Sequence, residues 1–354
     1  MVLVVKICSS PSLLLVLISA AMICQRVYPF VATTLRMSST SQASASPSLS
    51  TVDRLFDSHW RKKDLPRNSL LLTYLEINGW ILTINGVTVL VDPILDGPLD
   101  FGIPLLYKAK KRVIASEGLI PRLPPIDGIL ITQGLDDHAH SRTLQLMSKQ
   151  LALKTLPIVA PPSAVGTLLN CGFLAGNVKS IHHGEEVYIC AKDNGNNRLR
   201  IRATQGALVG PPWQARENGY IIGGGTSNNN KGRNGDVYTI PSLYIEPHVE
   251  FSSEELKLLA PVDVVITPVV GQSIKPGYEL VHGPNDALRL IETLRPKFVM
   301  PMNNGDVIQE GPACALVLEV GSVAEFGQRL GKEDWAKGIE LVPVKPGQDI
   351  EITV

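Results

Sequence analysis

The first ordered part of the chain consists of short apolar, β-rich runs that are divided by turn residues. Three such runs can be recognised, at residues 71–77, 79–84 and 87–91. They are separated by Asn78-Gly79 and by Asn85-Gly86, and Asn-Gly between apolar runs is the strongest short hairpin signal. The pattern therefore predicts three consecutive antiparallel strands that end at Asp92-Pro93.

Farther along, apolar runs of strand length alternate with stretches of helical spacing. Strands are predicted at residues 129–131, 156–160, 178–181, 199–203, 220–222, 237–240, 243–245, 264–266 and 298–300. Helices are predicted at residues 142–154, 163–169, 252–259 and 285–294. Strands followed by helices, twice over, favour an α/β (α+β) fold, a four-layer αββα sandwich of two mixed β-sheets with helices on the outer faces.

Two segments depart from this pattern. Residues 93–125 are rich in proline and include four basic side chains within residues 108–112. Such long excursions are uncommon unless they are functional, so we expect a surface loop beside the site. Residues 224–236 are rich in glycine and asparagine, which predicts a disordered hairpin tip.

The first fifty residues have the composition of a targeting leader. Lys6 precedes an apolar run at residues 13–24, and a segment rich in Ser, Thr and Ala follows, with no acidic residue before Asp53. We therefore expect a signal plus transit peptide at 1–50, a linker at 51–68 and a single domain at 69–354, with the mature protein in the plastid (chloroplast). A signal anchor or an ordinary secretory signal is the alternative.

Composition limits the possible partners. The chain has 354 residues, 44% of them hydrophobic, with 33 basic and 33 acidic side chains, so its balanced charge gives no reason to expect a nucleic-acid partner. The leader's apolar run is too short to span a bilayer comfortably, so no stable membrane span is expected after its removal. Cys171, Cys190 and Cys314 are widely spaced, which indicates neither a disulfide framework nor a zinc ribbon.

Candidate chemistry is concentrated after the predicted strand at residues 129–131. Within nine residues the chain places Asp136, Asp137, His138 and His140 on what reads as a loop. Carboxylates and imidazoles crowded at the end of a strand are the usual components of a metal or catalytic site.

At this loop the chain resembles the metallo-β-lactamase superfamily. The superfamily pattern is strand-Thr-His-x-His-x-Asp-His, and residues 132–138 match it in length and in the final Asp137-His138, whereas Gln133 and Leu135 replace the two leading histidines. The resemblance covers roughly residues 70–310. The order and spacing of the motifs are most similar to those of the lactonase- and phosphodiesterase-like branches. Gln-Gly-Leu-x-Asp-His-Ala-His, Gly-Pro-Pro-Trp-Gln and Glu-Pro-His look like a plant and cyanobacterial offshoot of these branches.

The resemblance also shows what has changed at the site. No histidine is present at residues 203–214, where the family has its second histidine-bearing strand end, and Asn303 replaces the last histidine. Pro247 falls at the position of the bridging aspartate, but Glu246 and His248 flank it. We therefore expect one rebuilt site for a single transition metal, with zinc favoured and iron or manganese as alternatives.

We expect the following roles at this rebuilt site. The metal ligands would be His138, His140, Glu246 and His248, and Asp137 or Asp136 would act as base or orienting group. Asp92, Gln133 and Asn303 would support the site structurally. Trp213, Gln214 and Arg216 would bind the substrate. The implied function is hydrolysis of an ester-type bond (phosphodiester, lactone or thioester) in a small molecule by a metal-bound hydroxide. The alternative is a non-catalytic binding module that keeps the fold.

Overall fold

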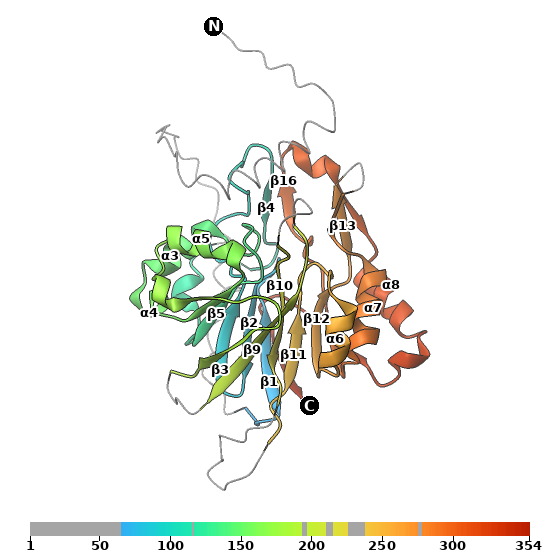
Figure 1. The fold of residues 1–354 in the computed structure, drawn as a ribbon. Coiled ribbons are helices and arrows are strands. Elements are labelled where there is room, and N and C mark those ends of the chain that lie inside the picture. The colour runs from blue at the N-terminus through green and yellow to red at the C-terminus, as the bar shows by residue number, and fades with distance from the viewer. Residues whose placement is uncertain (1–64, 115–116, 193–196, 210–214, 226–237, 275–277) are drawn as a thin grey trace.

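Two seven-stranded mixed sheets stack face to face in the computed structural model, which describes residues 65–114, 117–192, 197–209, 215–225, 238–274 and 278–354 (Figure 1). In spatial order, the first sheet contains β19 (Asp349–Thr353), β1 (Ser69–Tyr74), β2 (Trp80–Ile84), β3 (Val87–Val91), β5 (Gly128–Leu130), β6 (Ile158–Ala160) and β7 (Val178–Ser180). The second contains β18 (Glu340–Leu341), β15 (Phe298–Met302), β12 (Val264–Pro268), β11 (Ser242–Ile245), β10 (Asn218–Gly223), β9 (Arg198–Gln205) and β8 (Glu186–Cys190).

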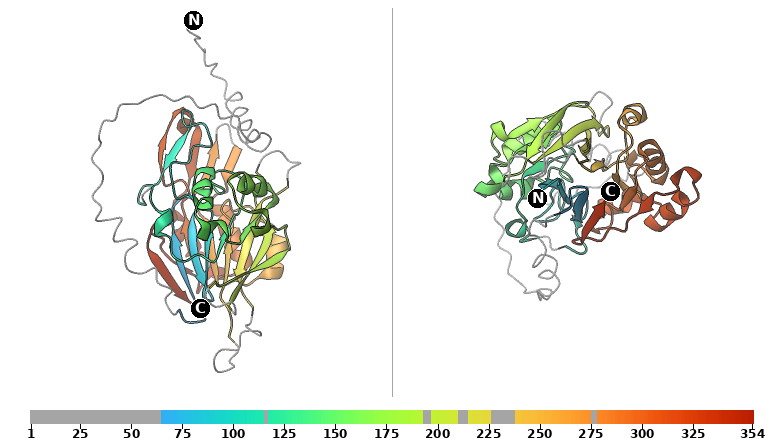
Figure 2. Two further views of the ribbon diagram at one scale, coloured as in Figure 1. Left: turned by 90° about the vertical axis from the view of Figure 1, so that its left-hand side faces the viewer. Right: turned by 90° about the horizontal axis from the view of Figure 1, so that it is seen from below.

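Helices lie on both outer faces of this sandwich, so the predicted αββα arrangement is confirmed (Figures 1 and 2). The first sheet is covered by α3 (Ser141–Ser148), α4 (Leu151–Lys154) and α5 (Pro162–Asn170). The second is covered by α6 (Ser253–Leu259), α7 (Pro284–Leu294) and α8 (Val323–Leu330). Short 3-10 turns lie at η1 (Ile120–Arg122), η2 (Ala175–Asn177), η3 (Pro312–Leu316) and η4 (Asp334–Ala336).

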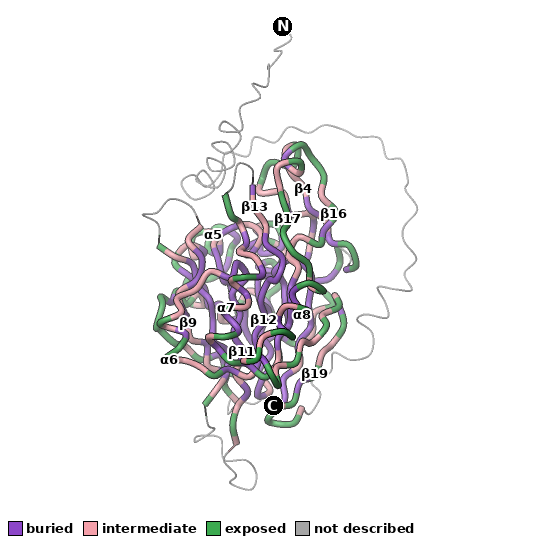
Figure 3. Tube along the Cα trace, turned by 90° about the vertical axis from the view of Figure 1, so that its right-hand side faces the viewer, coloured by how far each residue is buried: buried purple, intermediate pink, exposed green. Residues whose placement is uncertain are grey.

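Three apolar layers hold these elements together. Figure 3 shows the buried residues, in purple, along the interior of the molecule. The central layer lies between the sheets and includes the fully buried Trp80 and Tyr220, while the outer layers join each sheet to its helices. Strands such as β3 and β12 are buried on both faces, which explains why they read as continuous apolar runs rather than as alternating patterns.

Both predicted hairpins are present, but the first strand ends at Tyr74, and residues 75–79 rather than Asn78-Gly79 alone join it to the second. Asn85 and Gly86 join β2 to β3 with φ of 53° and 70°, the backbone conformation that makes Asn-Gly favourable in a tight hairpin turn. β3 then pairs in parallel with β5, so that both strands end at the same edge of the sheet. This edge carries Asp92 after β3 and the loop of acids and histidines after β5.

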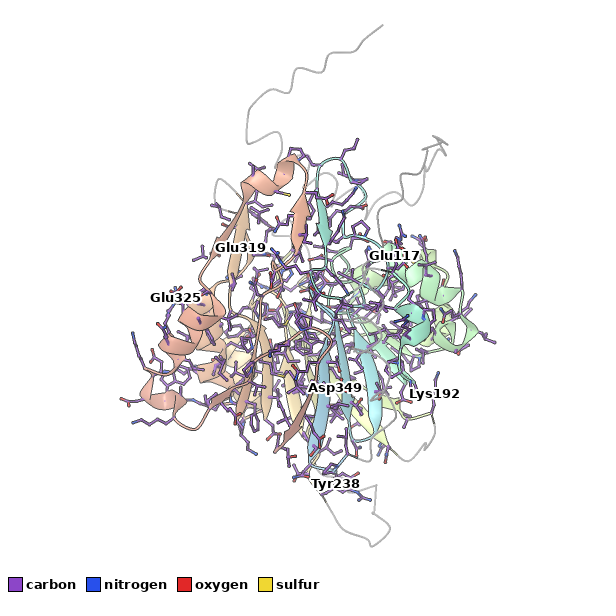
Figure 4. The ribbon with its side chains drawn as sticks, turned by 180° about the vertical axis from the view of Figure 1, so that it is seen from behind. Glu117, Lys192, Tyr238, Glu319, Glu325 and Asp349 are labelled. Atoms are coloured by element: carbon purple, nitrogen blue, oxygen red, sulfur yellow. The ribbon has the colours of Figure 1, made fainter. Side chains whose placement is uncertain are left out.

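Two small sheets extend beyond one end of the sandwich, and we call them, together with η3, the crown (Figures 1 and 4). They are made of β4 (Lys108–Lys110) with β16 (Ile308–Glu310), and of β14 (Tyr278–Val281), β13 (Gly271–Ile274) and β17 (Val317–Val320). The sequence pattern did not predict these strands, because each is short and half exposed. Figure 4 labels Glu319 on β17, on the outside of the crown.

Some predicted boundaries were wrong. The predicted helix at 142–154 is divided into α3 and α4, since Gln150 is extended and starts the second helix. Of the predicted strand at 237–240, residues 238–240 form only an isolated bridge. The predicted surface loop at 93–125 contains β4 and η1. The leader at 1–50, most of the linker and nearly all of the hairpin tip lie outside the described residues, and no helix within the described part has the length and apolarity to cross a bilayer.

Candidate metal centre

His138 lies at the centre of the site and is fully buried. Its Nδ1 is 2.8 Å from Oδ2 of Asp92, the first residue after β3. Asp92 also accepts hydrogen bonds from the backbone N–H of Thr132, at 2.8 Å, and from the Thr132 hydroxyl. Asp92 therefore joins the ends of β3 and β5 and orients the imidazole so that Nε2 faces away from it.

Two further ligand atoms meet the free side of this imidazole. Nε2 of His138 is 3.2 Å from Nε2 of His248 and 3.2 Å from Oδ2 of Asp137. The ligand atoms of these three residues all lie within 4.8 Å of one another. The structure thus brings together Asp137 and His138, which are adjacent in sequence, with His248, which follows β11 in the second sheet.

The electrostatic environment of this cluster favours one positive charge at His138. Burial alone would lower the pKa of His138, but the carboxylates of Asp137 and Asp92 outweigh burial and raise this pKa to about 10. Burial, together with the charge on His138, lowers the pKa of His248 to about 3. The carboxylates that favour a proton at His138 would equally favour a bound cation.

Two asparagines complete the site, and sequence reasoning missed both. Nδ2 of Asn78 lies 3.2 Å from Nε2 of His138 and donates to the Asp137 carbonyl at 3.0 Å. Asn304 donates to Oδ1 of Asn78 at 2.7 Å and to the carbonyl of Pro247 at 3.0 Å. The sequence pattern identifies Asn78 only as a turn residue. Asn304 could have been found, because it directly follows Asn303 at the position of the family's last histidine ligand.

The structure does not bring His140 into the cluster. Nδ1 of His140 is 2.8 Å from the Thr143 hydroxyl, and a backbone hydrogen bond with Pro98 involves the same ring. Asp136 lies beside His140 and accepts the backbone N–H of Ser141 at 2.9 Å. Burial raises the pKa of Asp136 and lowers that of His140. These two residues therefore have their partners around the start of α3 and are not members of the cluster.

Glu246 is also outside the cluster, although His248, two residues later in the chain, belongs to it. Its Oε2 accepts the backbone N–H groups of His248 and Glu250, at 3.1 and 2.9 Å, so it fixes the loop that carries His248. Burial raises the pKa of Glu246 to about 8. Its Oε1 is buried without a hydrogen-bond partner among the described residues.

The remaining predicted residues have varied surroundings. Both amide atoms of the buried Gln133, and Oδ1 of Asn303, have no hydrogen-bond partner in the described part of the chain. Arg216 forms an ion pair with Glu250, so its charge is already matched. Trp213 and Gln214 lie outside the described residues.

The Asp137–His138–His248 set fits a transition metal chemically. Two imidazole nitrogens and one carboxylate form a recognised set for a catalytic metal, with a position left for water. One further observation supports this fit: Oδ1 of Asp137 is buried and has no hydrogen-bond partner among the described residues. The ligand atoms of the three side chains thus lie close enough together to bind one ion.

Comparisons with known proteins agree with this architecture. The family model described as "Beta-lactamase superfamily domain" matches residues 71–303. A search of curated proteins found no significant match.

Three similar solved structures share the fold. The first is Igni18, a metallo hydrolase from the archaeon Ignicoccus hospitalis, with 18% identity and a TM-score of 0.51 over 80% of this chain and 98% of its own. The second is a possible metal-dependent hydrolase from Veillonella parvula, with 16% identity and a TM-score of 0.53 over 80% and 99%. The third is an isothiocyanate hydrolase from Delia radicum gut bacteria, with 15% identity and a TM-score of 0.53 over 80% and 99%.

Proposed function

The chain belongs to the metallo-β-lactamase superfamily, and from this premise we propose that it is a metal-dependent hydrolase with one transition metal per chain. The observation that carries the proposal is the convergence of Asp137, His138 and His248, whose ligand atoms lie within 4.8 Å of one another. This set revises the sequence-based one, in which His140 and Glu246 were ligands. Zinc suits two imidazoles and a carboxylate, and iron or manganese would suit them as well.

The chain's own residues have separable tasks in such a reaction. When bound, the metal would lower the pKa of water from about 15.7 to about 7 and so make a nucleophile available at neutral pH. Asp92 and Asn78 hold the His138 ring so that Nε2 faces the cluster. Oδ1 of Asp137 has no hydrogen-bond partner in the described structure and can accept a proton from the attacking water. An ester-type bond is the target that this chemistry suits.

Metal content tests the proposal directly. Purified protein should contain about one tightly bound transition metal per chain, and His138→Ala with His248→Ala should remove it. His140→Ala is the matched control, because His140 lies on the same loop but bonds Thr143 instead. If metal analysis finds no stoichiometric metal, and the double variant changes only stability or partner binding, the alternative of a non-catalytic module is correct.

We also propose that the leader directs the protein to the plastid. The proposal rests on the apolar run and the acid-free segment rich in Ser, Thr and Ala that precede Asp53. A reporter fused to residues 1–50 should enter the plastid, whereas a secreted reporter would contradict this location.

A further inference from the structure

A cavity of about 190 Å³ lies over the cluster, and it limits which ester the site can accept. Asp137 and His248 contribute to its lining, so a molecule in the cavity contacts the proposed reaction centre. Most of the remaining lining comes from the crown and from the chain between β3 and β4. The crown, which projects beyond the sandwich in Figure 1, therefore also shapes the cavity.

The walls of this cavity are predominantly apolar. Characteristic side chains are Leu99, Phe101, Leu106, Ile274, Val307 and Val317. Apolar walls stabilise apolar parts of a ligand by removing both surfaces from water, while a few polar groups fix the orientation. The cavity is thus suited to a hydrophobic substrate whose reactive bond reaches Asp137 and His248.

The charged groups in the lining are of one sign or already partnered. Apart from two tyrosines, the ionisable residues in the described lining are four carboxylates and two histidines, Asp100, Asp137, Glu250, Glu279, His248 and His282. Neither lysine nor arginine is among the described lining residues. His282 does not compensate for this, because Glu250, Glu279 and Asp286 surround its ring at 3.8, 3.5 and 3.3 Å.

The basic side chains near the cavity are directed elsewhere. In β4, Ala109 lines the cavity while Lys108 and Lys110 alternate to the other face, as a strand requires. Lys110 pairs with Glu310 at 2.6 Å, and Arg216 is held by Glu250. An anionic group held away from the reacting bond would therefore meet carboxylates, because the proposed metal would lie at Asp137 and His248 and no lysine or arginine lines the rest of the described part of the cavity.

We propose that the substrate is a carboxylic ester, thioester or lactone whose remaining part is apolar and carries no negative charge. This inference rests on the proposed function. Water oxygen adds to the carbonyl carbon, the bond to the leaving oxygen or sulfur breaks, and a proton passes to the leaving group. The products are a carboxylic acid and an alcohol or thiol.

The test combines binding and turnover on the full-length, metal-loaded protein. Binding is measured by displacement of the neutral fluorophore N-phenyl-1-naphthylamine. We expect γ-decanolactone to compete at least about tenfold better than γ-butyrolactone, which has the same ring without the apolar tail. We also expect p-nitrophenyl octanoate to be hydrolysed in preference to bis-p-nitrophenyl phosphate. Equal competition by γ-butyrolactone, or preference for the phosphodiester, would overturn the inference.

Two adjacent residues of β17 provide a matched pair of variants. Val317 lines the cavity, whereas Leu318 is 42% exposed and does not. Val317→Glu should weaken lactone binding by about tenfold or more, and Leu318→Glu by less than about twofold. Ile103→Glu is a second lining variant, at a side chain 36% exposed and thus tolerant of charge, and thermal midpoints verify that all three variants fold. Equal effects of Val317→Glu and Leu318→Glu would show that the ligand does not bind in the cavity lined by Val317.

The outcomes also separate this inference from the function on which it rests. Lactone binding with the expected preference but without hydrolysis of any ester would contradict the proposed hydrolase alone. Hydrolysis with a preference for the phosphodiester would contradict the substrate class alone.

Discussion

The loop after β5 carries two acid–histidine pairs that look equivalent in sequence and differ completely in the structure. Asp137 and His138 face His248 across the two sheets. Asp136 and His140 contact Ser141 and other groups at the start of α3. The residue types are the same, so what separates the pairs is the set of elements that surrounds each one.

The difference shows that the partner of a histidine determines its chemistry more than its neighbours in sequence do. The ring of His138 has Nδ1 on the buried Asp92, and its Nε2 faces the other two candidate ligands, Asp137 and His248. The ring of His140 is engaged by Thr143 and Pro98. A pair of this kind can bind a metal only where one ring nitrogen remains available.

The largest effect should come from removing Asp92, which supports the first pair, and we compare it with removing Asp136, the acid of the second pair. Asp92→Ala would leave His138 and the Thr132 N–H buried without their partner, so we expect a loss of about 3 to 5 kcal/mol and of metal retention. Asp136→Ala removes one acceptor at the start of α3 and should cost about 1 kcal/mol, with metal kept. Denaturant unfolding and metal analysis measure both. Similar losses in the two variants would show that the pairs are not distinct.

A second prediction concerns Lys111, whose charge acts on His140. Lys111 is buried, its Nζ has no hydrogen-bond partner among the described residues, and burial lowers its pKa to about 8 from 10.5. Between these values the unfolded chain binds more protons than the folded one, so stability rises with pH across this window. Below pH 8 the buried charge costs about 3 kcal/mol.

Lys111→Met should therefore stabilise the protein by up to about 3 kcal/mol at pH 7, and the gain should shrink as the pH approaches 10.5. Lys110→Met is the control, because Lys110 is exposed and paired with Glu310, and its change should be within about 1 kcal/mol. Denaturant unfolding at pH 7, 8.5 and 10 measures both. A gain that does not depend on pH would contradict the assignment to a buried charge.

A smaller effect than at Asp92 or Lys111 is expected at Thr143, which supports only the second pair. Its hydroxyl oxygen accepts the backbone N–H groups of Leu95 and Asp96 and contacts Nδ1 of His140. Thr143→Val keeps the shape but removes these contacts, so we expect a loss of about 2 kcal/mol without a change in metal content. Loss of metal in this variant would show that the two pairs act together.

Much of the sandwich could be predicted because its elements are encoded locally. Asn85-Gly86 specifies a tight hairpin, and buried runs such as Val264–Pro268 appear in sequence as continuous apolar stretches. The crown could not be predicted, since β4 and β16 are three-residue strands that come together from opposite parts of the chain. Their pairing depends on long-range contacts that no local pattern records.

The site was predictable only in part for the same reason. The sequence located Asp137, His138 and His248 as candidate groups, but it could not show that the ring of His140 is engaged by Thr143. The spacing of Glu246 and His248 suggested a common face for both. The chain instead turns after β11, so that Glu246 accepts the backbone N–H of His248 while the His248 ring faces His138.

The pairing of β1 with β19 has a consequence for the synthesis of the protein. Ser69 bonds Thr353 across 284 residues of chain, and Thr73 bonds Asp349, which is labelled in Figure 4. A ribosome therefore releases β1 long before the strand that covers its outer edge exists. Until then β1 presents unpaired N–H and C=O groups, the arrangement that recruits other chains. A chain shortened to the region of the family match, which ends at residue 303, would keep that exposed edge permanently and should aggregate.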